Sequence, residues 1–240
     1  MITIYKVLSV LLSYPTRELQ LAVPDLLKAL ESDPGVSKSS QKSIERLARN
    51  IADRDIYDAQ ERYVLLFDRT RSLSLHLFEH VHGESRDRGQ AMVDLNEMYA
   101  ASGIDINTSE LPDYLPLFLE YLSISSASDA SELLEQVAHI VVTLRTRLAK
   151  RKSVYSEAFR GLEDYVGRKP DPEIVMHLLS QEEDDPNDLE ELDNIWKDDP
   201  VTFGGNAGDN ACGLDRIRVQ ARAAQRRPAE SPGTTSAAEV

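Results

Sequence analysis

The residues best suited to chemistry lie close together, within residues 66–90. His76, Glu79 and His80 match the H-x-x-E-H pattern of zinc-dependent proteases. On a helix, residues four apart share a face, so the two imidazoles could bind zinc beside a carboxylate, and His82 could add a ligand. A zinc hydrolase also needs a further downstream ligand, and the two remaining histidines have no motif around them. A metal-dependent hydrolase that uses His76, Glu79 and His80 is therefore one alternative.

Two other interpretations of this stretch remain open. In the first, Leu77, Phe78 and Val81 belong to the core, and the histidines hydrogen-bond to nearby carboxylates. In the second, histidines and arginines project from a rigid element and form a binding surface. The arginines of the stretch, which either pair with local acids or form an anion site, are Arg69, Arg71, Arg86 and Arg88.

The overall charge limits the class of partner. The 240-residue chain has 27 Lys and Arg against 41 Asp and Glu, which gives a formal net charge of −14 and a pI of about 4.8. A nucleic-acid-binding protein must neutralise phosphates with cations, so this balance argues against that class. It favours a basic partner, because opposite potentials steer association.

The location expected from the sequence is the cytoplasm. Cys212 is the single cysteine, so the chain can form neither an internal disulfide nor a thiolate zinc site. Residues 1–6 lack the basic start and the apolar run that are typical of a signal peptide. No stretch approaches the ~18 consecutive apolar residues that cross a bilayer, so we expect no membrane insertion.

Apolar periodicity predicts an all-α fold, a single globular multi-helix domain of about eight to ten helices. Residues 73–77 alternate between apolar and polar types, but one isolated strand cannot form a sheet. Gly103 stands where a left-handed helix end is expected. The predicted helices cover approximately residues 3–13, 16–30, 37–51, 55–68, 86–99, 109–122, 128–152 and 153–165.

Residues 110–122 form the second unusual stretch. Apolar side chains surround the whole predicted helix, which is typical of a central helix. Its polar features are Asp113, Glu120 and the tyrosines Tyr114 and Tyr121. This stretch is either a core helix with an acid near its positive end, or one wall of a groove that binds an amphipathic peptide helix.

The composition divides the chain into three parts. Residues 1–169 are predicted to form the helical domain, residues 170–203 an acidic linker with a short helix, and residues 204–240 a disordered tail. Within the linker, residues 182–199 contain ten acids and one base. The short helix is indicated by the helical spacing of Leu189, Leu192 and Trp196.

These stretches also carry a resemblance to a known family. Within residues 63–95, the runs Tyr-Val-Leu-Leu-Phe-Asp-Arg and His-Leu-Phe-Glu-His-Val-His-Gly-Glu-Ser-Arg-Asp-Arg-Gly-Gln-Ala-Met closely resemble the delta subunit of respiratory nitrate reductase, the molybdenum cofactor assembly chaperone. Residues 111–116 and 14–15 also match, and the resemblance covers about residues 1–203. The wider group of redox-enzyme maturation chaperones is all-helical. Its hinge motif reads Glu-Pro-x-Asp-His; the equivalent place here is Pro112-Asp113-Tyr114, with Tyr in place of His.

The resemblance implies a dedicated chaperone and not an enzyme. Such chaperones bind the N-terminal segment of the apo catalytic (alpha) subunit of nitrate reductase, alone or within the alpha–beta complex. They hold it in the cytoplasm while the molybdenum bis(guanine dinucleotide) cofactor is inserted, and then release it for membrane docking. The resemblance therefore implies no catalytic residue, no resident metal and no tightly bound cofactor. A second alternative is direct carriage of the molybdenum cofactor, with Arg86 and Arg88 contacting its phosphates.

Together, the two stretches predict a groove for the N-terminal helix of the client. Burial of the apolar face of the peptide would supply affinity, and charge would steer the encounter. Histidines titrate near neutral pH, so client release could depend on protons. The candidate peptide-binding residues are Arg69, His76, Glu79, His80, His82, Arg86, Arg88, Gln90, Asp113, Tyr114, Leu117, Glu120 and Tyr121.

Overall fold

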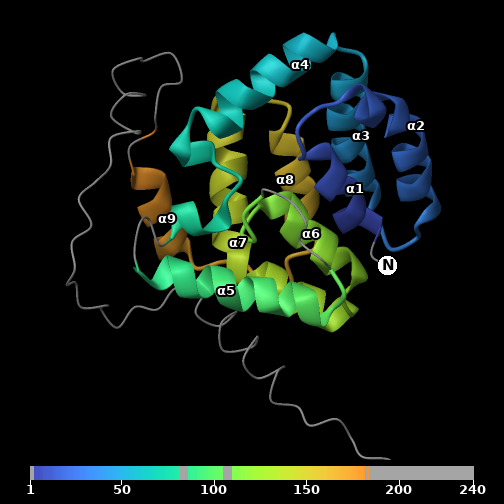
Figure 1. Ribbon diagram of the computed structural model, residues 1–240. Helices are drawn as coiled ribbons and strands as arrows, with labels where there is room; N and C mark the ends of the chain where they lie inside the picture. Colours follow the sequence, from blue (N-terminus) through green and yellow to red (C-terminus); the bar gives the residue numbers. More distant parts are fainter. Residues whose placement is uncertain (1–2, 82–85, 105–109, 182, 184–240) are drawn as a thin grey trace, which may run out of the picture.

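Nine α-helices and no strand make up the part of the chain that the computed structural model describes, which is residues 3–81, 86–104, 110–181 and 183 (Figure 1). This confirms the predicted all-α fold. Three short turns of other helical types, η1 (Val64–Asp68), η2 (Arg71–Leu73) and η3 (Leu77–His80), follow α4. The α-helices are α1 (Thr3–Leu11), α2 (Arg17–Ser32), α3 (Lys38–Ala52), α4 (Ile56–Tyr63), α5 (Arg86–Ala101), α6 (Leu115–Ile124), α7 (Ala127–Lys150), α8 (Ser156–Glu163) and α9 (Pro172–Ser180).

The helix ends follow local chemistry. Thr16 caps α2 by accepting a hydrogen bond from the Leu19 amide at 3.1 Å, and Ser37 caps α3 in the same way. Ser126 caps α7, because its hydroxyl accepts from the Asp129 amide, so the helix begins one residue before the predicted boundary at residue 128. Gly103 has φ 80°, which confirms the predicted left-handed end of α5.

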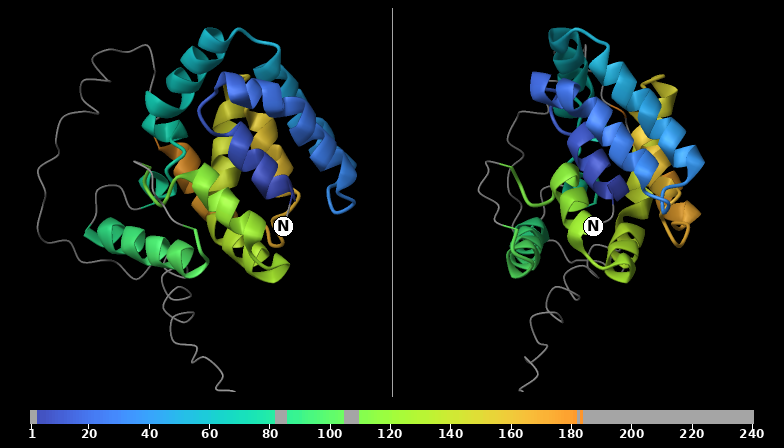
Figure 2. Two further views of the ribbon diagram at one scale, coloured as in Figure 1. Left: turned by 45° about the vertical axis from the view of Figure 1, so that its right-hand side comes forward. Right: turned by 90° about the vertical axis from the view of Figure 1, so that its right-hand side faces the viewer.

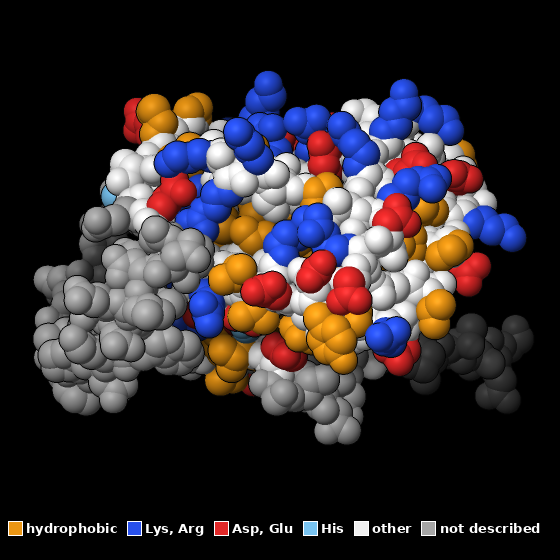
Figure 3. Space-filling model, turned by 90° about the horizontal axis from the view of Figure 1, so that it is seen from above, with side chains coloured by type: hydrophobic (Ala, Val, Ile, Leu, Met, Phe, Trp, Pro, Cys, Tyr) orange, Lys and Arg blue, Asp and Glu red, His pale blue; other side chains and the backbone are white. Residues whose placement is uncertain are grey.

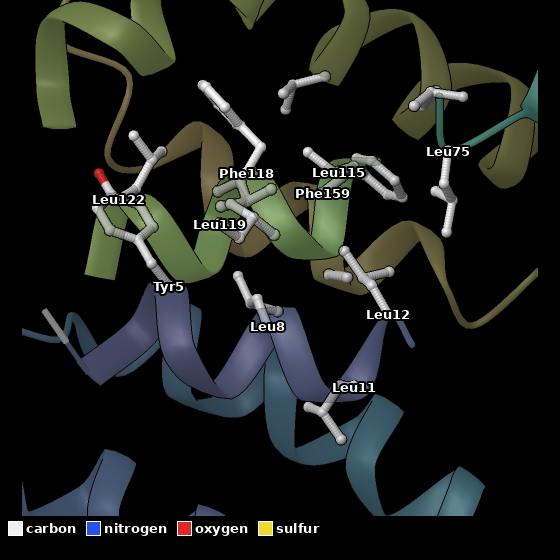
Figure 4. Close-up of a cluster of buried hydrophobic side chains, with 14 of the residues drawn as sticks. Tyr5, Leu8, Leu11, Leu12, Leu75, Leu115, Phe118, Leu119, Leu122 and Phe159 are labelled. Carbon is white, nitrogen blue, oxygen red and sulfur yellow. The ribbon is translucent and has the colours of Figure 1, made fainter. Parts of the chain in front are cut away.

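The core lies where α1 packs against α6 (Figure 4). Both helices are strongly apolar, so each can bury most of its circumference. Figure 4 shows side chains of α1 pointing at those of α6, with Phe159 of α8 behind them. The central position predicted for residues 110–122 is therefore right for α6. The side chains at this contact include Tyr5, Leu8, Leu115, Phe118, Leu119 and Leu122.

The remaining helices surround this pair. Helix α7 packs against both α6 and α8, and α2 and α3 lie side by side at one edge (Figure 2). Helices α4 and α5 lie at opposite ends of the bundle (Figure 1). Among the described residues, no helix is long and apolar enough to cross a membrane.

Residues 64–81 and 110–114 depart from the predicted pattern. The helix predicted over residues 55–68 changes from α to π geometry at Val64, and the chain then turns twice through short 3-10 segments. The helix predicted from residue 109 begins instead at Leu115. The pairing of the segment before α6 with the segment after α4 explains the departures at residues 75–77 and 113–114, because backbone groups that bond across to another segment cannot also form α-helical bonds there.

Helix α9 packs against α7 near its C-terminal end. Leu178 is buried, and its carbonyl accepts a hydrogen bond from the buried guanidinium of Arg147 on α7. The same guanidinium donates to the carbonyl of Ser72 at 2.8 Å, so one side chain holds α9 and η2 to α7. The division at residues 169 and 203 stays a prediction, because the helix predicted around Leu189 and the tail lie outside the described residues.

Lys152 closes the turn between α7 and α8 in an unfavourable conformation. Its φ is 54°, the left-handed region that favours glycine, and it is the one non-glycine residue of the described chain with positive φ. We expect Lys152→Gly to raise the free energy of unfolding by about 0.5–1 kcal/mol, measured by urea denaturation. Lys152→Ala is the control, because it removes the charge but keeps the strain. An equal gain in both variants would show that charge, and not backbone strain, is the cause.

Candidate functional site

The site is built where the turn after α4 meets the start of α6. His76 and Tyr114 form an isolated antiparallel bridge. The Leu77 amide donates to the Asp113 carbonyl at 3.0 Å, and the Leu115 amide donates to the Leu75 carbonyl at 2.8 Å. The alternating residues 73–77 therefore pair with a partner segment almost 40 residues away, and this pairing places the two unusual stretches against each other.

Asp113 anchors this junction. Its side chain is completely buried, and its Oδ2 accepts a hydrogen bond from the Phe78 amide at 3.0 Å. Its Oδ1 lies 3.1 Å from Nδ1 of His76. Burial lowers the pKa of His76, but the hydrogen bond and charge of Asp113, with the charges of Glu79 and Glu110, outweigh it and raise the pKa. Asp113 thus orients the imidazole and favours its charged form.

A chain of aromatic rings extends from His76 to the end of α1. The rings of His76 and Tyr114 are 5.4 Å apart, and the Tyr114 hydroxyl lies 2.9 Å from the Tyr63 hydroxyl. Tyr63 in turn donates to the Leu12 carbonyl and packs edge-on against Tyr14, with 5.6 Å between centroids. Burial raises the pKa of Tyr114 to about 12, so its hydroxyl remains a donor at neutral pH.

The outer side of this chain is apolar at its centre and acidic at its edge. Tyr14 and Leu111 are each 45% exposed, although both are large and apolar. Asp68 lies in the field of both Glu110 and His76: burial and Glu110 raise the pKa of Asp68, and His76 lowers it. We call this region the His76 surface, and it comprises Tyr14, Asp68, His76, Glu79, Glu110, Leu111 and Tyr114.

His80 does not share a face with His76. It is buried, and its Nε2 lies 2.8 Å from the Ser74 carbonyl. The motif forms a 3-10 turn over Leu77–His80 with His76 in an extended conformation before it, so the α-helical i, i+4 geometry assumed for zinc binding is wrong. Within the described residues, no group of three or more His, Cys, Asp or Glu side chains could hold a metal ion. Of the two other interpretations of this stretch, the first is confirmed for Leu77 and Phe78, which are core residues.

The buried histidines predict acid sensitivity. Burial, and then the charge of His80, lower the pKa of His139 from 6.5 to about 4, and burial also lowers the pKa of His80. Because folding lowers the pKa of His139, the stability of the folded chain is not reduced by this histidine above pH 6.5. That stability is lost progressively as the pH falls from 6.5 toward 4. His76 acts in the opposite sense: its pKa is raised, so its contribution is complete below pH 6.5 and is lost as the pH rises through its folded-state pKa.

We therefore expect His139→Gln to lose about 1–2 kcal/mol less stability than the unaltered chain between pH 7 and pH 5. Denaturant unfolding at the two pH values measures the difference. His177→Gln is the control, since His177 is exposed. Equal acid losses in all three proteins would contradict the assignment of the acid sensitivity to His139.

The structure divides the remaining candidate residues into separate groups. Arg88 lies 3.6 Å from Glu79, which brings α5 to the His76 surface. Glu120 forms an ion pair with Lys6, and Tyr121 packs against Tyr99 at 5.1 Å, so both lie in the α1–α6 and α5–α6 contacts. For four further candidates, no contact with the His76 surface is described. Gln90 bonds to Asp94 on its own helix, and Arg86 begins α5. Arg69 is exposed, and Leu117 is half-buried. His82 lies outside the described residues.

Four residues of the His76 surface were absent from the candidate residues. Tyr14, Asp68, Glu110 and Leu111 come from three separate segments, and no motif links them. Two signals were available. The Tyr14-Pro15 pair stops a helix and so exposes the tyrosine, and Leu111 precedes a proline at a turn.

Comparisons with known proteins identify close relatives along most of the chain. The family model described as "Nitrate reductase delta subunit" matches residues 33–160. The nitrate reductase molybdenum cofactor assembly chaperone NarJ of Escherichia coli K12 is 38% identical over 216 residues, which is 90% of each chain. The probable chaperone NarW of the same strain is 37% identical, over 88% of this chain and 87% of the relative. The probable chaperone NarJ of Bacillus subtilis is 33% identical, over 64% of this chain and 82% of the relative.

Proposed function

This chain belongs to the nitrate reductase delta subunit family, and we propose that it is a cytoplasmic chaperone that binds the N-terminal segment of the apo catalytic (alpha) subunit of respiratory nitrate reductase. Its relatives are named as molybdenum cofactor assembly chaperones and not as catalysts, so the chain is not an enzyme and its client is a nitrate reductase catalytic subunit. The finer steps that we propose are capture of the client N-terminus, alone or in the alpha–beta complex, and release before membrane docking.

The His76 surface is the observation that carries the proposed binding mode. It presents the exposed apolar side chains Tyr14 and Leu111 beside the half-buried Tyr114, and the acids Asp68 and Glu110 lie next to them. An amphipathic helix with basic residues fits such a surface, because its apolar face covers the apolar centre and its cations meet the acidic edge. Asp113 is fully buried, so its role in the proposal is to hold His76 and the turn in place.

The chaperone assists insertion of the molybdenum cofactor into its client. We propose that the cofactor is molybdenum bis(guanine dinucleotide) and that the chain does not hold it tightly. Arg88, one of the two arginines considered for direct phosphate contact, lies within ion-pair distance of Glu79. No observation among the described residues favours direct carriage, so client binding remains the one proposed function.

Calorimetry with a synthetic peptide of the client N-terminus tests the proposal. We expect saturable heat at micromolar peptide, which corresponds to a binding free energy of about −8 kcal/mol. Absence of saturable heat with the full chain would remove the N-terminal segment as the binding partner, while leaving the family assignment intact.

Charge reversal at the acidic edge should weaken binding in a salt-dependent way. We expect Asp68→Lys combined with Glu110→Lys to lower affinity for the peptide about tenfold or more in low salt, and much less in 1 M NaCl, where the Debye length is about 3 Å. The matched control is Asp25→Lys combined with Glu31→Lys on α2, where both side chains are exposed, which makes the same charge change elsewhere. A flat salt dependence, or an equal loss in the control, would show that steering at this edge is wrong.

A further inference from the structure

Helix α9 is attached to the rest of the fold by few side chains. Of its nine residues, Leu178 alone is buried, while Ile174 and Met176 are 38% and 61% exposed. Two clefts, of about 770 and 520 Å³, lie beside the segment that leads into α9, and Lys169 and Pro170 line both of them. An element with so few buried apolar contacts opens locally at a much lower free energy than the core does.

Surface ion pairs add a second, weaker attachment. Beyond the helix, Glu183 Oε1 lies 2.9 Å from Nζ of Lys150, and its Oε2 lies 3.9 Å from Nη2 of Arg151. The Lys150 side chain is 72% exposed, and the upper face of the molecule, where α7 ends (Figure 1), mixes basic with acidic side chains (Figure 3). Exposed pairs of this kind contribute little, because water and salt screen them. The docking of α9 therefore depends mainly on Leu178.

A buried cation binds the backbone carbonyl of Leu178. Arg147 of α7 is 2% exposed, and its Nη2 donates a hydrogen bond to this carbonyl. Leu178 lies in the last turn of α9, where carbonyls lack α-helical partners and the helix dipole favours a positive charge. Nη1 of the same guanidinium donates to the Ser72 carbonyl at 2.8 Å. Because the guanidinium is planar and rigid, it holds the two carbonyls in a fixed relation to each other.

Ser72 connects this guanidinium to the His76 surface. It lies in η2, four residues before His76 along the chain. Two residues beyond His76, the Phe78 amide donates to the buried carboxylate of Asp113 at 3.0 Å. The turn that presents His76 is therefore held on both sides, by Arg147 before it and by Asp113 after it.

We propose that Arg147 is a positioning residue that couples the docking of α9 to the shape of the His76 surface. When α9 is docked, its last turn holds the guanidinium where it also binds the Ser72 carbonyl. When α9 opens, the buried cation loses one of its acceptors, and its orientation toward Ser72 becomes unfavourable. The turn over residues 71–80 then loosens, and binding of the client there weakens. This last step rests on the proposed function, whereas the coupling of α9 to the turn does not.

Hydrogen exchange of the full-length chain, without any client, tests the coupling. In Leu178→Ala we expect the Leu77 and Phe78 amides to exchange about tenfold faster or more, because a hydrogen bond to a charged group is strong enough to change an equilibrium by that factor. The amides of α2 and α3 should exchange as in the unaltered chain. Ile174→Ser combined with Met176→Ser is the control, since it changes the exposed side of α9 and should leave the Leu77 and Phe78 amides unchanged.

A second variant tests the guanidinium itself. Arg147→Lys keeps the charge but lacks the planar fork that donates to both carbonyls. We expect it to speed exchange at the same two amides as the first variant does. Arg145→Lys on the same helix retains an ion pair with Glu163 and should not. Unchanged exchange in Arg147→Lys would overturn the proposal. Faster exchange in the first variant that is confined to α9, or that is equal in α2 and α3, would overturn it as well.

The client N-terminal peptide gives the reciprocal readout. Because a coupling free energy acts equally in both directions, bound peptide should slow the exchange of the α9 amides, and Leu178→Ala should weaken peptide binding about fivefold or more. If the peptide binds but the exchange of α9 does not change, the coupling is wrong and the proposed function stands. If the peptide does not bind, the proposed function fails, while exchange in the client-free chain still decides the coupling.

Discussion

Replacing Leu111 and Tyr114 with serine should weaken binding of the client peptide by about 30-fold or more, because truncation of a central apolar anchor commonly costs about 2 kcal/mol. Both side chains belong to the His76 surface, and Leu111 is 45% exposed before any partner binds. The fold should be little affected, since Tyr63 retains its bond to the Leu12 carbonyl when the Tyr114 hydroxyl is lost. Calorimetry at fixed salt measures the affinity.

The matched control for this double variant is Ile174→Ser combined with Met176→Ser on α9. These side chains are 38% and 61% exposed and lie away from the His76 surface. The control should bind the peptide as the unaltered chain does. Equal weakening in both variants would show that loss of any exposed apolar side chain has this effect, and an unchanged affinity in the first variant would place the client elsewhere.

Replacing Asp113 with alanine should lower the free energy of unfolding by about 3 kcal/mol. The change leaves the buried Phe78 amide without its acceptor and removes the partner of His76, and each loss costs about 1–3 kcal/mol. The turn over residues 71–81 should then protect its amides less from hydrogen exchange than the helices do. Denaturant unfolding gives the stability, and hydrogen exchange gives the location.

Two further variants separate the bonds of Asp113. Asp113→Asn keeps an acceptor for the Phe78 amide, so it should lower the free energy of unfolding less than Asp113→Ala does. His76→Gln should lower it least of the three, because His76 is partly exposed. If all three changes cost the same, the carboxylate would contribute through His76 alone. If Asp113→Ala were neutral, the anchoring role of Asp113 would be wrong.

Much of the fold was predictable because local rules decide it. Apolar periodicity is strong in α1, α3 and α7, and the capping hydroxyls of Thr16 and Ser37 begin α2 and α3 at the predicted boundaries. The central burial of α6 was also predictable, since its apolar residues surround the helix. In these elements local preference and tertiary packing agree.

The path of residues 64–81 was not predictable from local pattern. The H-x-x-E-H run is typical of a helix, but the buried carboxylate of Asp113, 35 residues beyond Phe78, accepts from the Phe78 amide and holds the turn in 3-10 geometry. Local spacing carries no information about such a long-range acceptor. The same limitation explains why His76 and His80, similar in sequence, have opposite environments.

The candidate site was predicted in part. The two stretches singled out in the sequence do meet, through the bridge between His76 and Tyr114. The apolar centre of the surface was missed, because Tyr14 is linked to Tyr114 and Leu111 only through Tyr63, after separate segments fold together. The ion pair of Glu120 with Lys6, 114 residues earlier, was also missed, because no sequence pattern links these two positions.

The most direct test of the central claim is a cross-linking map of the full-length chaperone with a client N-terminal peptide that carries a photoreactive phenylalanine analogue. The proposed function predicts that the cross-links concentrate on the His76 surface, at Tyr14, Leu111 and Tyr114. It also predicts that they disappear in the variant with serine at positions 111 and 114. Cross-links that concentrate on α2, α3 or α9, and that persist in that variant, would contradict it.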